Sequence, residues 1–151
     1  MAICAFFGHR DAPMSNRLEE RLETVVRELI TQNGVDHFWS CEQGTFDRLS
    51  RLVVKKFIKE FNLVFIHIVT AYFPSEAVQR WMDEQDYDLI YPEELVRVPK
   101  RAAIVRRNEY MVQNADFIVC YIDHDYGGAY EAVQKAKKYG KKIINLADEK
   151  Y

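Results

Sequence analysis

The residues best suited to chemistry lie directly behind the first apolar run of the sequence, in the stretch AICAFFGHRD. Gly8 ends this run, and His9, Arg10 and Asp11 follow it at once. Glycine allows the backbone to come close to a bound molecule, and the guanidinium of arginine can hold phosphate through two parallel hydrogen bonds. The stretch therefore indicates a loop that recognises an anionic group of a ligand.

Two later stretches also place glycine at the start of an expected helix. CEQGTFD contains Gly44, Thr45 and Asp47. IDHDYGGAYEA contains Gly127 and Gly128. The free N–H groups and the positive end of a helix favour a bound anion, and Thr45 adds a hydroxyl. Together the three turns predict a site for a phosphorylated small molecule, such as a mononucleotide, a dinucleotide or a nucleotide sugar. The Rossmann pattern GxGxxG and the Walker P-loop pattern are both absent, so standard dinucleotide binding and P-loop NTPase activity are not supported.

Short apolar runs alternate along the chain with segments whose apolar residues recur every three or four positions. The runs are typical of buried strands, and the periodic segments are typical of amphipathic helices. This alternation predicts an α/β, Rossmann-like, doubly wound fold, with a mostly parallel five-stranded sheet and helices on both faces. The expected strands are Ile3–Phe7, His37–Ser40, Leu63–Thr70, Phe117–Ile122 and Lys142–Leu146.

A single domain is expected to span residues 1–151, because this length is ordinary for one hydrophobic core. Residues 72–101 break the alternation, since they hold three of the four prolines and several aromatic residues. We expect an irregular insert there, with one short helix inside it. The expected helices are Ser15–Gln32, Phe46–Phe61, Ser75–Gln85, Ala102–Asn114 and Tyr126–Tyr139.

The order of these elements predicts where the glycine turns lie. We expect the first strand in the middle of the sheet, between the second and the fourth strands. Each glycine turn leads from a strand into a helix, so the three turns should meet at the carboxyl edge of the parallel sheet, where folds of this class bind their ligands. Tyr72 follows the third strand at the same edge and is the candidate to stack on a nucleobase.

The overall charge and the cysteines limit the choice of function. A net charge of −2 and a pI of about 6.1 argue against a general nucleic-acid binder, which usually has a basic excess. No apolar run approaches the roughly 18–20 residues of a membrane span, and the first run is too short for a secretory signal. We therefore expect a cytoplasmic protein without membrane contact. Cys4, Cys41 and Cys120 show neither CxxC nor Cys/His ligand spacing, which predicts no disulfide framework and no metal site.

Four stretches, FFGHRD, GTFD, RRNEYMVQNADFIVCY and GGAYEAVQKAKKYGKKIINL, together resemble the SLOG superfamily in its small YpsA-like branch. The same superfamily holds the Rossmann domain of DNA-processing protein A and the "lonely guy" phosphoribohydrolases. The resemblance covers nearly the whole chain and is weakest at residues 72–101. It implies a Rossmann-like fold that binds nucleotides or nucleotide-derived ligands, and a homo-oligomer. Carried over by motif, it marks as ligand-binding Gly8, His9, Arg10, Gly44, Thr45, Asp47, Arg107, Asn108, Gly127 and Gly128.

Two loops depart from the patterns of this superfamily. Cys41, Glu42 and Gln43 stand where relatives usually have small residues, which disfavours a close approach of phosphate there. The last loop, YGGAYEAV, keeps two glycines and Glu131 but lacks the glycine-threonine pair of the phosphoribohydrolases and is shorter. This second departure weakens the interpretation of the chain as an enzyme.

Three functions are therefore compared. We favour a domain that binds or senses a nucleotide or nucleotide-derived molecule and requires no cofactor. The alternative is an N-glycosidase for nucleoside monophosphates, in which Glu131 or Asp47 would stabilise a ribosyl cation or activate water. Single-stranded DNA binding is the lesser alternative.

Overall fold

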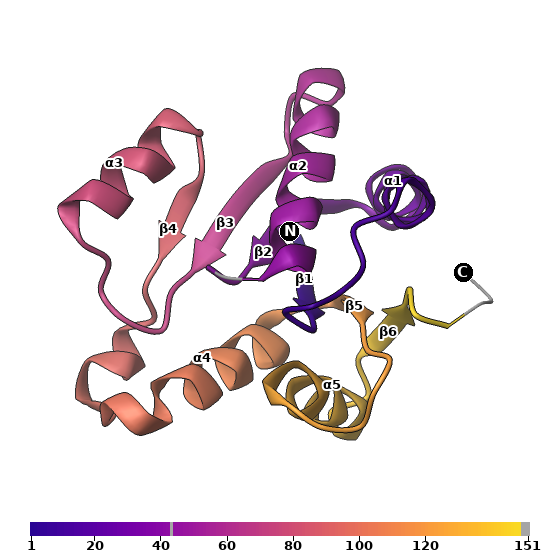
Figure 1. The fold of residues 1–151 in the computed structure, drawn as a ribbon. Helices are drawn as coiled ribbons and strands as arrows, with labels where there is room; N and C mark the ends of the chain where they lie inside the picture. Colours follow the sequence, from indigo (N-terminus) through magenta and orange to yellow (C-terminus); the bar gives the residue numbers. More distant parts are fainter. Residues whose placement is uncertain (43, 149–151) are drawn as a thin grey trace.

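The centre of the protein is a parallel sheet built around its first strand (Figure 1). The computed structural model describes residues 1–42 and 44–148; Gln43 and residues 149–151 lie outside it. Within the described residues the sheet has six strands in the order β4-β3-β2-β1-β5-β6. β1 pairs with β2 and β5, so the central position predicted for the first strand is confirmed. The strands are β1 Ala2–Gly8, β2 Val35–Ser40, β3 Phe65–Val69, β4 Asp88–Ile90, β5 Phe117–Tyr121 and β6 Lys142–Asn145.

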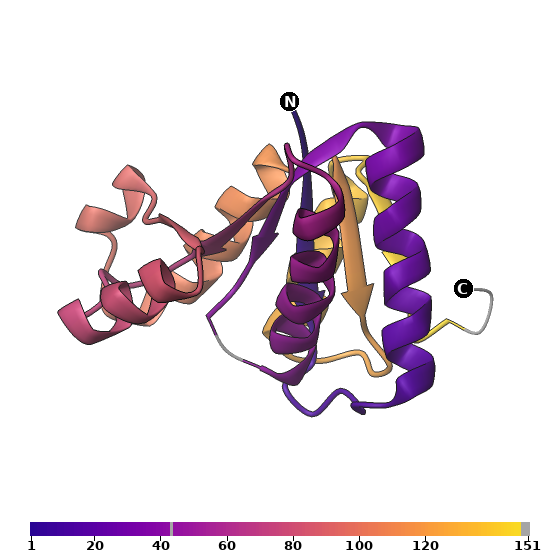
Figure 2. The ribbon, with the colours of Figure 1, turned by 90° about the horizontal axis from the view of Figure 1, so that it is seen from above.

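The expected number of five strands is wrong, because β4 lies in residues 72–101, the segment predicted to be irregular. β4 is three residues long, and it pairs with β3 from His67–Asp88 to Val69–Ile90. Three residues are too few to show a periodic pattern, which explains why the sequence did not reveal this strand. The helix expected in this segment is present as α3, Glu76–Glu84. Figure 2 shows β4 and α3 at the outer edge of the sheet, on the opposite side of the molecule from α1.

Helices cover both faces of the sheet, as predicted (Figure 1). The alternation of side chains along β1 separates the two faces: Cys4 and Phe6 pack in the core layer of α1 and α2. Ala5 and Phe7 pack in the layer of α4 and α5. A short 3₁₀ helix, η1, precedes α4. The bounds are α1 Asn16–Asn33, α2 Thr45–Glu60, η1 Glu93–Arg97, α4 Lys100–Asn114 and α5 Gly128–Lys138. None of the helices in the described part of the chain is long and apolar enough to cross a membrane.

Candidate functional site

A cavity of about 550 Å³ opens at the carboxyl edge of the sheet, where the loops after β1, β2, β3 and β5 face α4. Its volume lies in the range of pockets that enclose small organic ligands. Most of the residues predicted to bind a ligand line it. They are Gly8, His9, Arg10, Asp47, Tyr72, Arg107, Asn108, Gly127 and Gly128.

Thr45 and Gly44 do not line the cavity, but they contact the loop after β1, which does. The hydroxyl oxygen of Thr45 lies 2.8 Å from the carbonyl oxygen of Arg10 and 3.0 Å from that of Ala12, so its hydrogen is donated within the protein. The loop after β1 is thereby fastened to the first turn of α2. A side chain on Gly44 would come within 3.7 Å of the Arg10 Cα. The expectation that the Thr45 hydroxyl is offered to a ligand does not fit this geometry.

Two helices near the cavity begin after a glycine, and the N-terminus of α5 lines the cavity itself. α2 begins after Gly44, whose φ is 112° and ψ is 155°, and α5 begins after Gly127, whose φ is 99° and ψ is 168°. Residues with a side chain rarely adopt such backbone angles. No side chain of the described residues caps either helix. The Thr45 N–H at the start of α2 donates to the Arg10 carbonyl at 3.4 Å, whereas Gly127 and Gly128 at the start of α5 line the cavity, where their N–H groups can bind an anion.

Two arginines line the same cavity in different ways. Arg10 is exposed on the loop after β1 and makes no ion pair with the described residues. Arg107, on α4, is buried, and its Nη1 donates to the Val69 carbonyl at 3.2 Å while its Nε donates to the Asn108 side chain at 3.0 Å. Nη1 also lies 3.6 Å from Glu42 Oε1. The Arg10 side chain is therefore free to move toward a ligand, whereas the Arg107 side chain is held in place by its hydrogen bonds.

Asp47 is a buried carboxyl group on the cavity wall. Its Oδ1 accepts the Cys41 N–H at 3.3 Å. Burial raises the pKa of Asp47 to about 7, although Arg51, the Cys41 N–H and Arg107 act in the opposite direction. The carboxyl group therefore exchanges a proton near neutral pH and is the one candidate catalytic residue that lines the cavity.

Replacing Asp47 with asparagine is expected to remove a pH dependence of folding stability. Because the pKa of Asp47 is raised above its unfolded value of about 3.9, the folded state holds this proton more tightly, and the resulting stability is lost as pH rises from about 4 through 7. The free energy of unfolding of the wild type should fall between pH 5 and 8 by about 1 kcal/mol or more relative to Asp47→Asn. Urea denaturation across this range measures it, with Asp83→Asn on the exposed face of α3 as control; parallel curves for all three proteins would contradict the prediction.

The loop between β5 and α5 adds aromatic rings that the sequence analysis did not single out. The ring centroid of His124 lies 3.3 Å from that of His9, with 13° between the planes, and 4.1 Å from that of Tyr126. Burial and the neighbouring His124 lower the pKa of His9. The letters IDHDYGG contained this signal, since a histidine and a tyrosine precede the two glycines. Tyr72 lies on the cavity wall, where its hydroxyl donates to the Lys100 carbonyl at 3.0 Å.

Glu131, the other candidate catalytic residue, does not line the cavity. It is exposed in the first turn of α5, and its backbone N–H donates to the Gly127 carbonyl at 3.0 Å. An acidic side chain at this position interacts favourably with the positive end of the helix. The geometry therefore favours a structural role for Glu131 over a catalytic one.

Comparison with known proteins supports the fold. No family model matches the chain, and no curated protein matches it in sequence. In structure it is similar to DNA processing protein A (DprA) from Streptococcus pneumoniae, with a TM-score of 0.64 and 16% sequence identity. The similarity covers 94% of this chain and 49% of that one, so the chain spans about half the length of the solved protein. The Rossmann-like fold implied by the sequence is thus confirmed.

Proposed function

We propose that this chain binds a nucleotide or nucleotide-derived small molecule in the cavity at the carboxyl edge of its sheet. In this proposal it is a small SLOG-type protein of the YpsA-like branch. One observation carries the proposal: the N-terminus of α5, which has no side-chain cap, and two arginines, Arg10 and Arg107, converge on one cavity. Aromatic rings also line the cavity, so it offers contacts for both the phosphate and the base of a nucleotide.

The phosphate end of the ligand is assigned to the loops after β1 and β5. A phosphate there would accept hydrogen bonds from the N–H groups at the start of α5, at Gly127 and Gly128, and from the free guanidinium of Arg10. Arg107 is held by Val69 and Asn108 and would meet the ligand with little loss of side-chain entropy. These charges are local, which is why the net charge of −2 does not oppose an anionic ligand.

The base end of the ligand is assigned to the rings that face the cavity. Tyr126 and His124 lie on one wall with their rings tilted by 35°, and Tyr72 lies on the wall formed by the loop after β3. Stacking of a base on an aromatic ring contributes about 1–3 kcal/mol and tolerates every base. The proposal therefore specifies a nucleotide and leaves the base open.

Replacing Arg10 with alanine is expected to weaken nucleotide binding by about 10- to 100-fold, because a hydrogen bond to a charged group contributes about 1.5–3 kcal/mol. The fold should not change, since Arg10 is exposed. Calorimetric titration with adenine and guanine mono- and dinucleotides, ribose 5-phosphate and inorganic phosphate measures the effect. Arg80→Ala, an exposed arginine on α3, is the matched control. Equal affinity in the Arg10 variant and the wild type would remove Arg10 from the site.

Single-stranded nucleic acid is the second candidate ligand, since the solved structure to which this chain is similar, DprA, is that of a DNA processing protein. The same experiment separates the two candidates if labelled oligonucleotides are added to the panel. A nucleotide site should bind a mononucleotide as tightly as an oligonucleotide of the same base. A nucleic-acid site should gain affinity with length and lose it steeply with salt. Absence of binding to every member of the panel would overturn the proposed function.

A further inference from the structure

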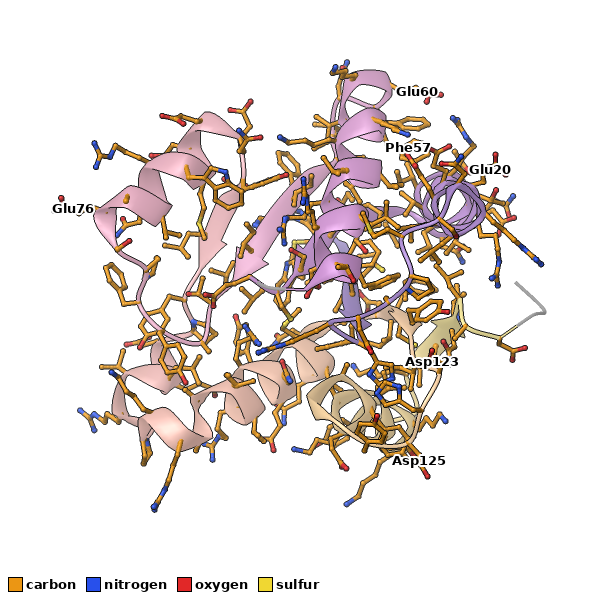
Figure 3. All side chains as sticks on the ribbon, in the orientation of Figure 1. Glu20, Phe57, Glu60, Glu76, Asp123 and Asp125 are labelled. Atoms are coloured by element: carbon orange, nitrogen blue, oxygen red, sulfur yellow. The ribbon has the colours of Figure 1, made fainter. Side chains whose placement is uncertain are left out.

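We propose that His9, Asp123 and His124 bind a divalent transition-metal ion beside the cavity. One ligand atom from each of these residues lies within 4.8 Å of the other two. His9 directly follows β1, and the other two residues lie on the loop from β5 to α5, where Figure 3 shows Asp123. Two imidazoles and one carboxylate form a donor set that zinc, cobalt and related ions accept.

The three groups can meet one ion if the His124 side chain rotates. Asp123 Oδ1 is 2.7 Å from His124 Nδ1 and 3.7 Å from His9 Nε2. Ligand atoms around a tetrahedral zinc ion lie roughly 3.3–3.5 Å apart, given bonds of about 2.0–2.2 Å. The rings of His9 and His124 are stacked, so the His124 ring has to turn for both nitrogens to face the ion. His124 is partly exposed, with 26% of its side chain accessible, and has the room to turn.

The buried His9 nitrogen points to a ligand at this position. Only 5% of the His9 side chain is accessible, and its Nε2 has no hydrogen-bond partner among the described residues. Buried polar atoms are nearly always satisfied, so an orphaned imidazole nitrogen next to a carboxylate calls for an explanation. An ion shared with Asp123 would supply the missing partner.

The backbone around the three residues is held on both sides. The His9 N–H donates to the Tyr121 carbonyl at 3.2 Å, and β1 and β5 pair at Gly8 and Tyr121. The Asn145 side chain accepts the Ile122 N–H and donates to the Ile122 carbonyl, both at 3.0 Å. The residue before Asp123 is therefore fixed to β6. Asp123 pairs with no lysine or arginine of the described residues, and its carboxylate partners are the two histidines.

An ion at this position would leave coordination sites open toward the cavity, because His9 and His124 both line it. The ion would then lie beside the cavity that Arg10 also lines, and it could coordinate a phosphate oxygen of a bound ligand. The metal site does not require the proposed nucleotide function, since it rests on the three side chains alone.

Titration with metal ions alone tests the proposal. The protein, freed of any histidine tag and of bound metal by a chelator, is titrated with Zn²⁺ in a calorimeter and with Co²⁺ by visible absorption. We expect one equivalent to bind, with the absorption bands of a cobalt ion in a nitrogen and oxygen environment. His9→Ala and His124→Ala should each weaken binding by about tenfold or more. No nucleotide is present, so failure of the nucleotide experiments would leave this result standing.

The matched control is His37→Ala, because His37 Nδ1 lies 2.8 Å from His67 Nε2 in a second imidazole pair, between β2 and β3. This variant should bind metal as the wild type does. Loss of binding in His37→Ala with no change in His124→Ala would place the ion at the other pair and overturn the proposal. No binding of either ion by the wild type would overturn it as well. Circular dichroism checks the fold of each variant, and His124→Ala decides if His9→Ala does not fold.

Discussion

Replacing Gly8 with alanine is expected to lower the free energy of unfolding by about 1–3 kcal/mol or more, although the change adds a single methyl group. A Cβ on Gly8 would lie 2.4 Å from the Phe46 Cβ and 2.5 Å from its Cγ. Phe46 cannot simply turn away, because its ring is buried and packs on the rings of Phe6 and Tyr121. Either α2 moves away from the end of β1, or the core around Phe46 rearranges. Both changes would also displace the loop that carries His9.

Urea denaturation of Gly8→Ala and the wild type measures this effect. Gly128→Ala is the matched control, since a Cβ there would meet no described atom closer than the Asn108 Nδ2 at 4.0 Å. The control should be as stable as the wild type to within about 1 kcal/mol, because alanine is also a better helix former than glycine. Equal stability of all three proteins would show that β1 and α2 do not pack as described.

Replacing Arg107 with methionine is expected to weaken ligand binding by about 30- to 1,000-fold, the larger of the two arginine effects. Truncating a buried, hydrogen-bonded charge at a binding site typically costs about 2–4 kcal/mol or more, against less for an exposed one. Methionine fills similar space but donates no hydrogen bond to the Val69 carbonyl or the Asn108 side chain. The variant therefore loses both a cation and the group that orients Asn108.

Calorimetric titration with the tightest ligand of the nucleotide panel measures the loss. Arg106→Met is the control next to it on α4: Arg106 is exposed and pairs loosely with Glu109 at 3.9 Å. Its affinity should match the wild type. The two variants should remain folded by circular dichroism. If Arg106→Met weakened binding as much as Arg107→Met did, the loss would reflect the charge of α4 as a whole and not a contact in the cavity.

The fold could be predicted because most strands and helices of this chain are long enough to carry a recognisable apolar pattern. The five longer strands each carry an apolar run, and most of the helices between them show apolar residues that recur every three or four positions. The parallel pairing of the strands follows from the alternation of strands and helices. β4 could not be found in this way, because Asp88–Ile90 offers only three residues and owes its pairing to β3. Its hydrogen bonds depend on tertiary contacts.

The candidate site was predictable at positions where the backbone conformation requires a particular residue type. It was less predictable where a side chain can form hydrogen bonds with several different partners. Gly127 needs its glycine in any structure that turns this way, and the sequence pointed to it. Thr45 could donate to a ligand or to its own chain, and only the fold brings the carbonyls of Arg10 and Ala12 within its reach. The stack of His9 on His124 joins residues far apart in sequence and depends on β1 and β5 being neighbours.

The central place of β1 also decides when this protein can fold during synthesis. β2 follows β1 closely, but the other neighbour is β5, and the bond from the Ile3 N–H to the Asp116 side chain spans 113 residues. At about 5–20 residues per second, a ribosome needs roughly 6–20 seconds to cover that distance. Throughout this interval one edge of β1 has no partner strand, and an unpaired apolar edge can associate with other chains. The pair of β1 with β5, and the cavity lined by His124 and Gly127, can therefore form only after β5 and the loop that follows it have been synthesised.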